Sequence, residues 1–155
     1  MLVEHAEAAD LPLDFDEREP FSIRVLAPVR TLAEKLVILH HAAIDGDDAR
    51  KARVARHYYD IERLLDSDVV RNAFASDPCD VLAREVCRHS EVAGLEYKER
   101  PQGGFAASPA FDPATATVAR AAYRNVVVPQ LIWPSATPPT FEDCCQTVRR
   151  FEDLL

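Results

Sequence analysis

The chain has 155 residues, a mass of 17.3 kDa and a formal net charge of -8 at pH 7. This length suits one compact domain, and a composition of 48% hydrophobic and 28% charged residues excludes collagen-like, low-complexity and wholly disordered proteins. Residues 1–20 hold seven acidic side chains against Arg18 alone. A protein this acidic is not expected to be a general polyanion binder, although a local basic face can still exist.

The first 27 residues are predicted to contain one or two short strands and a connector. Met1–Ala6 has the composition of a short strand, and the acidic stretch after it lacks helical periodicity. Phe21–Leu26 alternates apolar and polar side chains, which predicts a half-buried strand that ends before Pro28. Because two isolated strands cannot bury both of their faces, we expect them to belong to a sheet that the chain does not itself contain.

Residues 28–155 are predicted to form a helical C-terminal domain. Apolar periodicity and end signals predict helices over 28–44, 48–65, 68–74, 78–94, 114–128 and 140–155, with Gly46 closing the first, Pro129 ending the fifth and Thr140 opening the last. Three prolines and two glycines predict a loop over 98–113. The expected fold class is mainly α: a helical bundle preceded by one or two short β-strands.

The cysteines and the N-terminus indicate a cytoplasmic protein with no membrane association. The four cysteines form no C-x-x-C pair and are interpreted as reduced thiols (Cys79, Cys87, Cys144 and Cys145). No basic segment precedes an apolar stretch, and no apolar run approaches the roughly 18 residues of a membrane span, so no signal peptide is expected.

Lys35 is the first candidate functional residue. It lies within a predicted helix whose neighbours are almost all apolar, and the chain has only two other lysines, Lys51 and Lys98. A lysine in such a helix could direct its ammonium at a phosphate, or its stem could cross the apolar surface so that the charge reaches solvent beside Thr31 and Glu34. The residue pattern alone favours the second interpretation.

Asp60 is the second candidate, because Arg56, His57 and Arg63 lie one helical turn before or after it. Its carboxylate could act as a base, contact a metal or orient a group such as Lys35 across a helix pair, or it could form a solvated ion pair of little energetic value. The surrounding stretch is also a candidate nucleic-acid-binding face. An ordinary solvated helix explains the same pattern equally well. This basic face comprises Arg50, Lys51, Arg53, Arg56, His57 and Arg63, with Tyr58 and Tyr59 among them.

The sequence offers no convincing metal site or nucleophile. Adjacent His40 and His41 point about 100° apart on a helix and cannot readily share an ion. The three D-x-D triplets, at 14–16, 45–47 and 66–68, lie in a connector, a turn and a helix cap, and no Gly-Ser step precedes any of them. A histidine-centred hydrolase built from His40, His57 and Asp60 is a third, weaker hypothesis.

Several segments together resemble the AbiEii/MenT-type nucleotidyltransferase toxins. The segments are Pro28–Leu36 (PVRTLAEKL), Leu39-His40, Arg56–Ile61 (RHYYDI), Tyr123 and Pro138–Asp143 (PPTFED), so the resemblance spans about residues 21–155. The resemblance implies an N-terminal nucleotidyltransferase-like α/β domain followed by a helical domain. Residues 1–27 would then be a remnant of the α/β domain, and residues 28–155 would be the helical domain. Members use a nucleoside triphosphate (NTP) and a divalent metal such as Mg²⁺, some modify the 3′ end of tRNA, and a cognate antitoxin restrains them.

The resemblance also implies roles for individual residues. Lys35 would bind the nucleotide phosphates and Asp60 would be the active-site carboxylate, while Arg30, Arg53, Arg56 and His57 are the expected substrate-binding residues. The family's Gly-Ser and D-x-D motifs are expected upstream of Met1. We therefore expect a toxin-antitoxin component that is inactive alone and exposes enough apolar surface to self-associate. The alternative is a non-enzymatic remnant or binding module that contacts tRNA, the antitoxin or a separate catalytic half.

Overall fold

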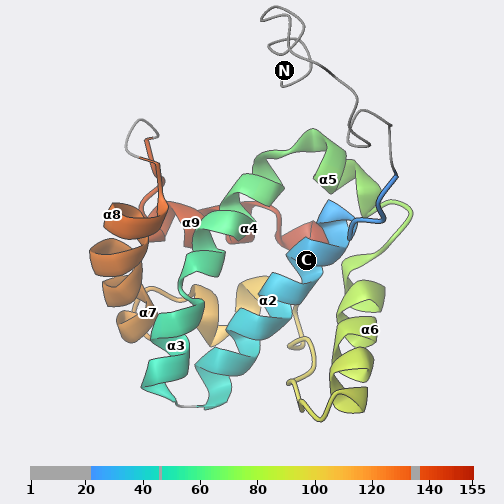
Figure 1. Ribbon diagram of the computed structural model, residues 1–155, viewed down its shortest axis with the longest axis horizontal. Coiled ribbons are helices and arrows are strands. Elements are labelled where there is room, and N and C mark those ends of the chain that lie inside the picture. The colour runs from blue at the N-terminus through green and yellow to red at the C-terminus, as the bar shows by residue number, and fades with distance from the viewer. Residues whose placement is uncertain (1–21, 46, 134–136) are drawn as a thin grey trace, which may run out of the picture.

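The computed structural model describes residues 22–45, 47–133 and 137–155 (Figure 1). Within these ranges every regular element is helical, which confirms the mainly α fold class. The α-helices are α2 (Pro28–Asp45), α3 (Asp48–Val54), α4 (Arg56–Asp66), α5 (Asp68–Ala73), α6 (Cys79–Val92), α7 (Thr117–Ala122), α8 (Val128–Leu131) and α9 (Phe141–Arg150). The described residues also form three short 3₁₀ helices, η2 (Phe105–Ala107), η3 (Pro109–Phe111) and η5 (Glu152–Leu154), and a π-helix, η4 (Tyr123–Val127). None of the helices in the described ranges is long and apolar enough to cross a membrane.

Helix α2 is the central element of the fold. It runs diagonally across the molecule, with α6 along one side and α3 and α4 along the other (Figure 1). Its near-continuous apolar sequence fits this position, because a helix covered on several sides must be apolar around most of its circumference. Six of its residues are at most 2% exposed (Leu32, Ala33, Leu36, Val37, Leu39 and Ala42).

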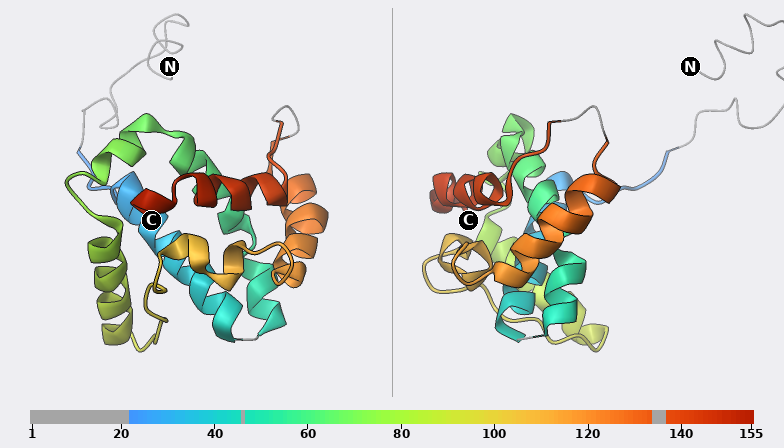
Figure 2. Two further views of the ribbon diagram at one scale, coloured as in Figure 1. Left: turned by 180° about the vertical axis from the view of Figure 1, so that it is seen from behind. Right: turned by 90° about the vertical axis from the view of Figure 1, so that its left-hand side faces the viewer.

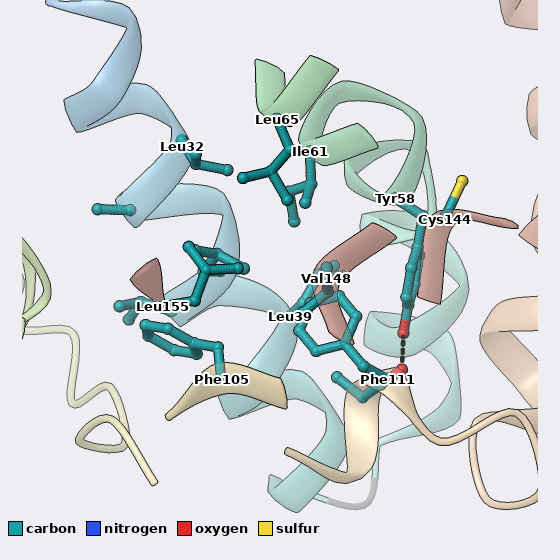
Figure 3. Packing of buried hydrophobic residues seen from close by; sticks show 14 of the residues in the cluster. Leu32, Leu39, Tyr58, Ile61, Leu65, Phe105, Phe111, Cys144, Val148 and Leu155 are labelled. Carbon is teal, nitrogen blue, oxygen red and sulfur yellow. Dashed lines mark hydrogen bonds between the residues drawn. The ribbon is translucent and has the colours of Figure 1, made fainter. Parts of the chain in front are cut away.

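Helices α4 and α9 pack against each other and complete the core. Seen from behind, α9 crosses the molecule in front of α4 (Figure 2). Each has one apolar face at helical spacing: Tyr58, Ile61 and Leu65 on α4, and Phe141, Cys144, Cys145 and Val148 on α9. Figure 3 shows several of these side chains meeting Leu32 and Leu39 of α2.

The start of α9 is fixed by a capping box, as its sequence predicts. The Thr140 hydroxyl accepts from the Asp143 backbone N–H at 3.1 Å, and the Asp143 carboxylate accepts from the Thr140 backbone N–H at 2.9 Å. The Tyr123 hydroxyl donates to the Pro139 carbonyl at 2.9 Å and ties η4 to the segment that leads into α9.

The prediction of preceding β-strands is wrong for the described residues. Residues 22–27 form no strand, and Ile23, Val25 and Leu26 are all more than half exposed. A strand needs a neighbouring strand for its hydrogen bonds, and the described residues supply none. Met1–Ala6, the other predicted strand, and Gly46, the predicted end of the first helix, lie outside the described residues.

The single helix predicted over 48–65 is two helices, α3 and α4, with a turn at Ala55. Ala55 is fully buried and donates its N–H to Ala52, three residues back, rather than four. The resulting bend lets α3 pack on α7 while α4 packs on α9, so tertiary packing overrides a pattern that is locally continuous.

Pro129 does not end its helix, contrary to the sequence prediction. The helical backbone continues to Leu131 because the five residues before Val128 are wound as a π-helix, in which the Val128 N–H reaches the Tyr123 carbonyl. A proline cannot donate an N–H and crowds the preceding turn, and the wider π turn accommodates both effects.

The segment predicted as a loop over 98–113 contributes to the core. It forms η2 and η3, and it buries Phe105 and Phe111 completely. Phe111 meets the Tyr58 ring edge-to-face, with ring centroids 5.7 Å apart (Figure 3).

Replacing Tyr58 with phenylalanine is expected to lower the free energy of unfolding by about 1–2 kcal/mol. The Tyr58 hydroxyl donates to the Ala110 carbonyl at 2.6 Å in the core, and its loss leaves that carbonyl buried without this donor. Urea denaturation measures the effect, with Tyr59→Phe on the same helix as the matched control. Equal stabilities of the two variants would contradict a structural role for this hydroxyl.

Candidate functional site

The structure brings Lys35, His57 and Asp60 together between α2 and α4. The Lys35 ammonium donates to Asp60 Oδ2 at 2.6 Å, and its Nζ lies 3.2 Å from His57 Nδ1. His57 Nδ1 is 3.4 Å from the same Asp60 oxygen. The exposed fractions of the three side chains are 18%, 12% and 37%, so the cluster is partly buried and solvent reaches it mainly through the carboxylate.

Two features of the sequence produce this cluster. Lys35 lies on the side of α2 that packs on α4. His57 and Asp60 lie three residues apart at the start of α4, which places them on one face of that helix. The ion pairs of Asp60 in the described residues are with Lys35 and His57, so it does not form the solvated pair with Arg56 that was one sequence interpretation.

The carboxylate of Asp60 is held in its charged form. Burial raises its pKa, but the hydrogen bonds with His57 and Lys35 and the positive charge of Lys35 outweigh burial, and the net pKa is lowered. An ionised aspartate 2.6 Å from an ammonium fixes the position of the lysine side chain. Lys35 therefore does not simply extend into solvent beside Glu34.

Arg30 lies away from this cluster. Its guanidinium donates to Glu85 at 2.7 Å and contacts His89 Nδ1 at 3.1 Å, which joins α2 to α6, and it also pairs with Glu34 at 3.4 Å. This arginine was predicted to bind substrate, but in the structure its contacts link two helices. Sequence reasoning missed this role because Glu85 and His89 lie 55 and 59 residues away in the chain.

Arg53 and Arg56 are both exposed, and within the described ranges neither has an ion-pair partner. The rest of the predicted basic face is partly neutralised, since Arg50 pairs with Asp45, Lys51 with Asp48 and Arg63 with Glu62. The two aromatic residues of the basic face lie in different environments. Tyr58 belongs to the core, whereas Tyr59 is half-buried under the Arg63 guanidinium, 5.7 Å from the ring centroid. The part of this face next to Asp60 therefore keeps both an aromatic ring and positive charge.

The side chains that the structure describes contain no group of three or more His, Cys, Asp or Glu residues that could hold a metal ion. Asp60, engaged by Lys35, is a poor ligand for Mg²⁺, which prefers several free oxygen donors. The described residues do not fit a metal centre. The four cysteines are all buried and free, and burial raises the pKa of Cys144 and Cys145 to about 12, so these two thiols are unreactive near neutral pH.

His40 and His41 are buried residues of α2. His40 Nδ1 lies 2.8 Å from the Ser108 hydroxyl, and the His41 ring packs against Tyr97. Burial lowers the pKa of both histidines from 6.5. Both rings are therefore neutral in the folded protein at pH 7.

The fold is expected to lose stability as the pH falls below about 6.5, because the unfolded chain protonates these two histidines before the folded chain does. Urea denaturation from pH 7 to pH 5.5 measures the slope of stability against pH. A double variant, His40→Gln with His41→Gln, should show a shallower slope. Identical slopes for the wild type and the variant would contradict this account.

Comparison with known proteins supplies a family for the chain. The family model described as "Nucleotidyl transferase AbiEii toxin, Type IV TA system" matches residues 1–146. The chain belongs to the AbiEii toxin family. No curated protein and no solved structure matches the chain.

Membership of the AbiEii family confirms the resemblance read from the R-T-x-x-E-K and R-H-Y-Y-D segments. It also supports a toxin role in a toxin-antitoxin system, with an antitoxin as partner, and the general use of an NTP and a metal. Lys35 and Asp60, which come from these two AbiEii segments, are the residues that the fold places 2.6 Å apart.

Proposed function

We propose that Lys35 and Asp60 form the helical-domain half of a nucleotidyltransferase site. In this site Lys35 binds the phosphates of a nucleoside triphosphate and Asp60 is the active-site carboxylate. The contact that carries the proposal is the 2.6 Å ion pair across α2 and α4, in a partly exposed cluster. An ammonium on a long stem suits phosphate binding, because it offers three donors that can turn toward different oxygens.

Asp60 would keep the ammonium in place until the phosphates arrive. Without it, a four-carbon side chain at the helix surface would sample many rotamers, and ordering it would weaken binding. We assign the exposed Arg53 and Arg56, together with His57, to the surface that contacts the substrates. Arg30 is better explained as the link between α2 and α6.

The acceptor that this family assignment favours is an RNA such as the 3′ end of tRNA, and the toxin would act on it in the cytoplasm. The 155 residues contain no Gly-Ser step followed by D-x-D, and the described residues offer no metal centre. We therefore expect this chain alone to bind an NTP without transferring the nucleotide. The second candidate is a non-enzymatic binding module, favoured by this missing motif and by the exposed Ile23, Val25 and Leu26, which could support self-association or contact with a partner.

Calorimetric titration with each of the four NTPs in the presence of Mg²⁺ tests the proposal. Each NTP is expected to bind, and inorganic tripolyphosphate is expected to compete because Lys35 contacts phosphates. In parallel, labelled NTP and total tRNA are expected to give no labelled RNA with this chain alone. Equally strong binding of nucleosides and NTPs, or no binding of either, would refute a phosphate site at Lys35.

A further inference from the structure

In the cluster formed by Lys35, His57 and Asp60, the His57 Nδ1 atom has two polar neighbours but can form a hydrogen bond with only one of them at a time. Lys35 Nζ and His57 Nδ1 both lie within reach of the same oxygen, Asp60 Oδ2, at 2.6 and 3.4 Å, and they lie 3.2 Å from each other. We propose that phosphate binding at Lys35 is coupled to the uptake of one proton by His57, which then replaces Lys35 as the partner of Asp60. This inference rests on the proposed function and adds a positioning residue and a pH dependence to it.

The hydrogen-bonding capacity of the groups permits two arrangements. An ammonium has only donors, so the contact between Lys35 and His57 is a hydrogen bond only when Nδ1 carries no proton and accepts. The contact between His57 and Asp60 is a hydrogen bond only when Nδ1 carries a proton and donates. Nδ1 cannot do both, so the exchange of one arrangement for the other requires a proton at Nδ1. Because the two distances differ by little, it requires only a small movement of the side chains.

The charges explain why phosphate would favour the second arrangement. When the imidazole is neutral, the charges of Lys35 and Asp60 sum to zero. An anion that approaches the ammonium then also meets the carboxylate, which lies 2.6 Å from the ammonium. A proton on His57 makes the cluster positive overall and gives Asp60 a second charged partner. The Lys35 ammonium is then free to turn its donors toward the phosphate.

Among the described residues, the charged groups that contact His57 are the two other members of the cluster. From α2 the charged group in contact with the ring is Lys35, and from α4 it is Asp60, while the positively charged Arg53 and Arg56 lie nearby in the chain. Most other charged groups described on elements packed around α4 have polar partners of their own: Glu34 with Arg30, Asp68 with Arg71, Glu142 with Arg120, Asp143 with Thr140, Arg124 with Asn125, and Arg149 with the Phe111 carbonyl. Arg150 of α9 stacks on the Phe151 ring. An arriving phosphate therefore adds the negative charge that offsets the two arginines.

Histidine suits this role because it gains a proton between about pH 5 and 8, near physiological pH. The His57 side chain is only 12% exposed, so Lys35 and Asp60 are its main polar contacts and little water can substitute for them. A purely structural histidine would need neither a charge nor a change of partner.

The test is calorimetric titration of the chain with inorganic tripolyphosphate in two buffers of different ionisation enthalpy, for the wild type and for His57→Gln. The difference in binding heat between the two buffers gives the number of protons taken up on binding. The number measured for His57→Gln gives the protons that tripolyphosphate itself exchanges. The wild type is expected to take up about one more proton than the variant. Its affinity should strengthen by about tenfold between pH 8 and pH 7, beyond any change in the variant.

Equal proton uptake and equal pH dependence in the two proteins would overturn the inference and leave the proposed phosphate site standing. Absence of tripolyphosphate binding in both would remove the proposed function and the inference with it. If His57→Gln does not fold, as judged by circular dichroism, the NMR signals of the His57 ring in the wild type decide. A shift toward the protonated ring on addition of tripolyphosphate supports the inference, and unchanged signals overturn it.

Discussion

Replacing Lys35 with alanine is expected to weaken NTP binding by about 10- to 100-fold. The change removes the charge-assisted hydrogen bonds to phosphate, each worth about 1.5–3 kcal/mol. It also leaves the Asp60 carboxylate, which then repels the triphosphate instead of positioning the ammonium. The fold should persist, because a partly exposed ion pair contributes about 1 kcal/mol or less.

Lys98→Ala is the matched control, because it removes the same charge from an exposed position outside the cluster. Titration with NTP and Mg²⁺ should give wild-type affinity for Lys98→Ala and strongly reduced affinity for Lys35→Ala. If the two variants lose affinity equally, binding depends on overall charge, and the assignment of Lys35 is wrong.

Replacing Phe111 with alanine is expected to lower the free energy of unfolding by about 3–5 kcal/mol, a large part of the roughly 5–15 kcal/mol of a typical domain. Phe111 is fully buried and lies edge-to-face with Tyr58. Its carbonyl also accepts from the Arg149 guanidinium at 3.1 Å, which links η3 to α9. The truncated side chain would leave a cavity at the junction of α2, α4 and α9 (Figure 3).

Thermal or urea denaturation of Phe111→Ala measures this loss. Trp133→Ala is the control, because Trp133 is also a large aromatic residue but is 74% exposed, and its truncation should change stability little. A loss below about 1 kcal/mol in Phe111→Ala would mean that the segment before α7 does not belong to the core.

The helices could be predicted from the sequence where one apolar face repeats at helical spacing and a cap is present. Helix α2 begins at Pro28 and α9 begins after Thr140, as the residues indicate. The bend at Ala55 and the continuation through Pro129 could not be predicted in this way. Both depend on contacts with elements distant in the chain, and neither is encoded in local propensity.

The role of segment 98–113 was missed for a related reason. Its glycines and prolines indicate a loop, but Phe105 and Phe111 within it are fully buried. Gly104 has φ +82°, a conformation that favours glycine, and a Cβ there would lie 3.0 Å from Leu155. Glycine therefore allows this segment to approach the end of the chain closely, and the sequence alone does not show that contact.

The candidate site was partly accessible from sequence. A lysine in an apolar helix and an aspartate among positive charges drew attention to Lys35 and Asp60, but neither pattern shows that they meet 2.6 Å apart. The i, i+3 spacing of His57 and Asp60 was visible, whereas the contact of His57 with Lys35 spans 22 residues. Arg30 illustrates the opposite case, since its place in a family-like segment suggested substrate binding and its contacts with α6 indicate packing.

The central claim is that Lys35 lies against the phosphates of a bound nucleoside triphosphate, and covalent labelling tests it most directly. An ATP derivative with an acyl group on its terminal phosphate transfers that group to a nearby lysine Nζ, forming an amide and releasing ATP. The chain has three lysines, and peptide mass spectrometry can quantify each (Lys35, Lys51 and Lys98). We expect preferential labelling of Lys35 that excess NTP suppresses. Equal labelling of all three lysines, or labelling of Lys35 that NTP does not suppress, would contradict the claim.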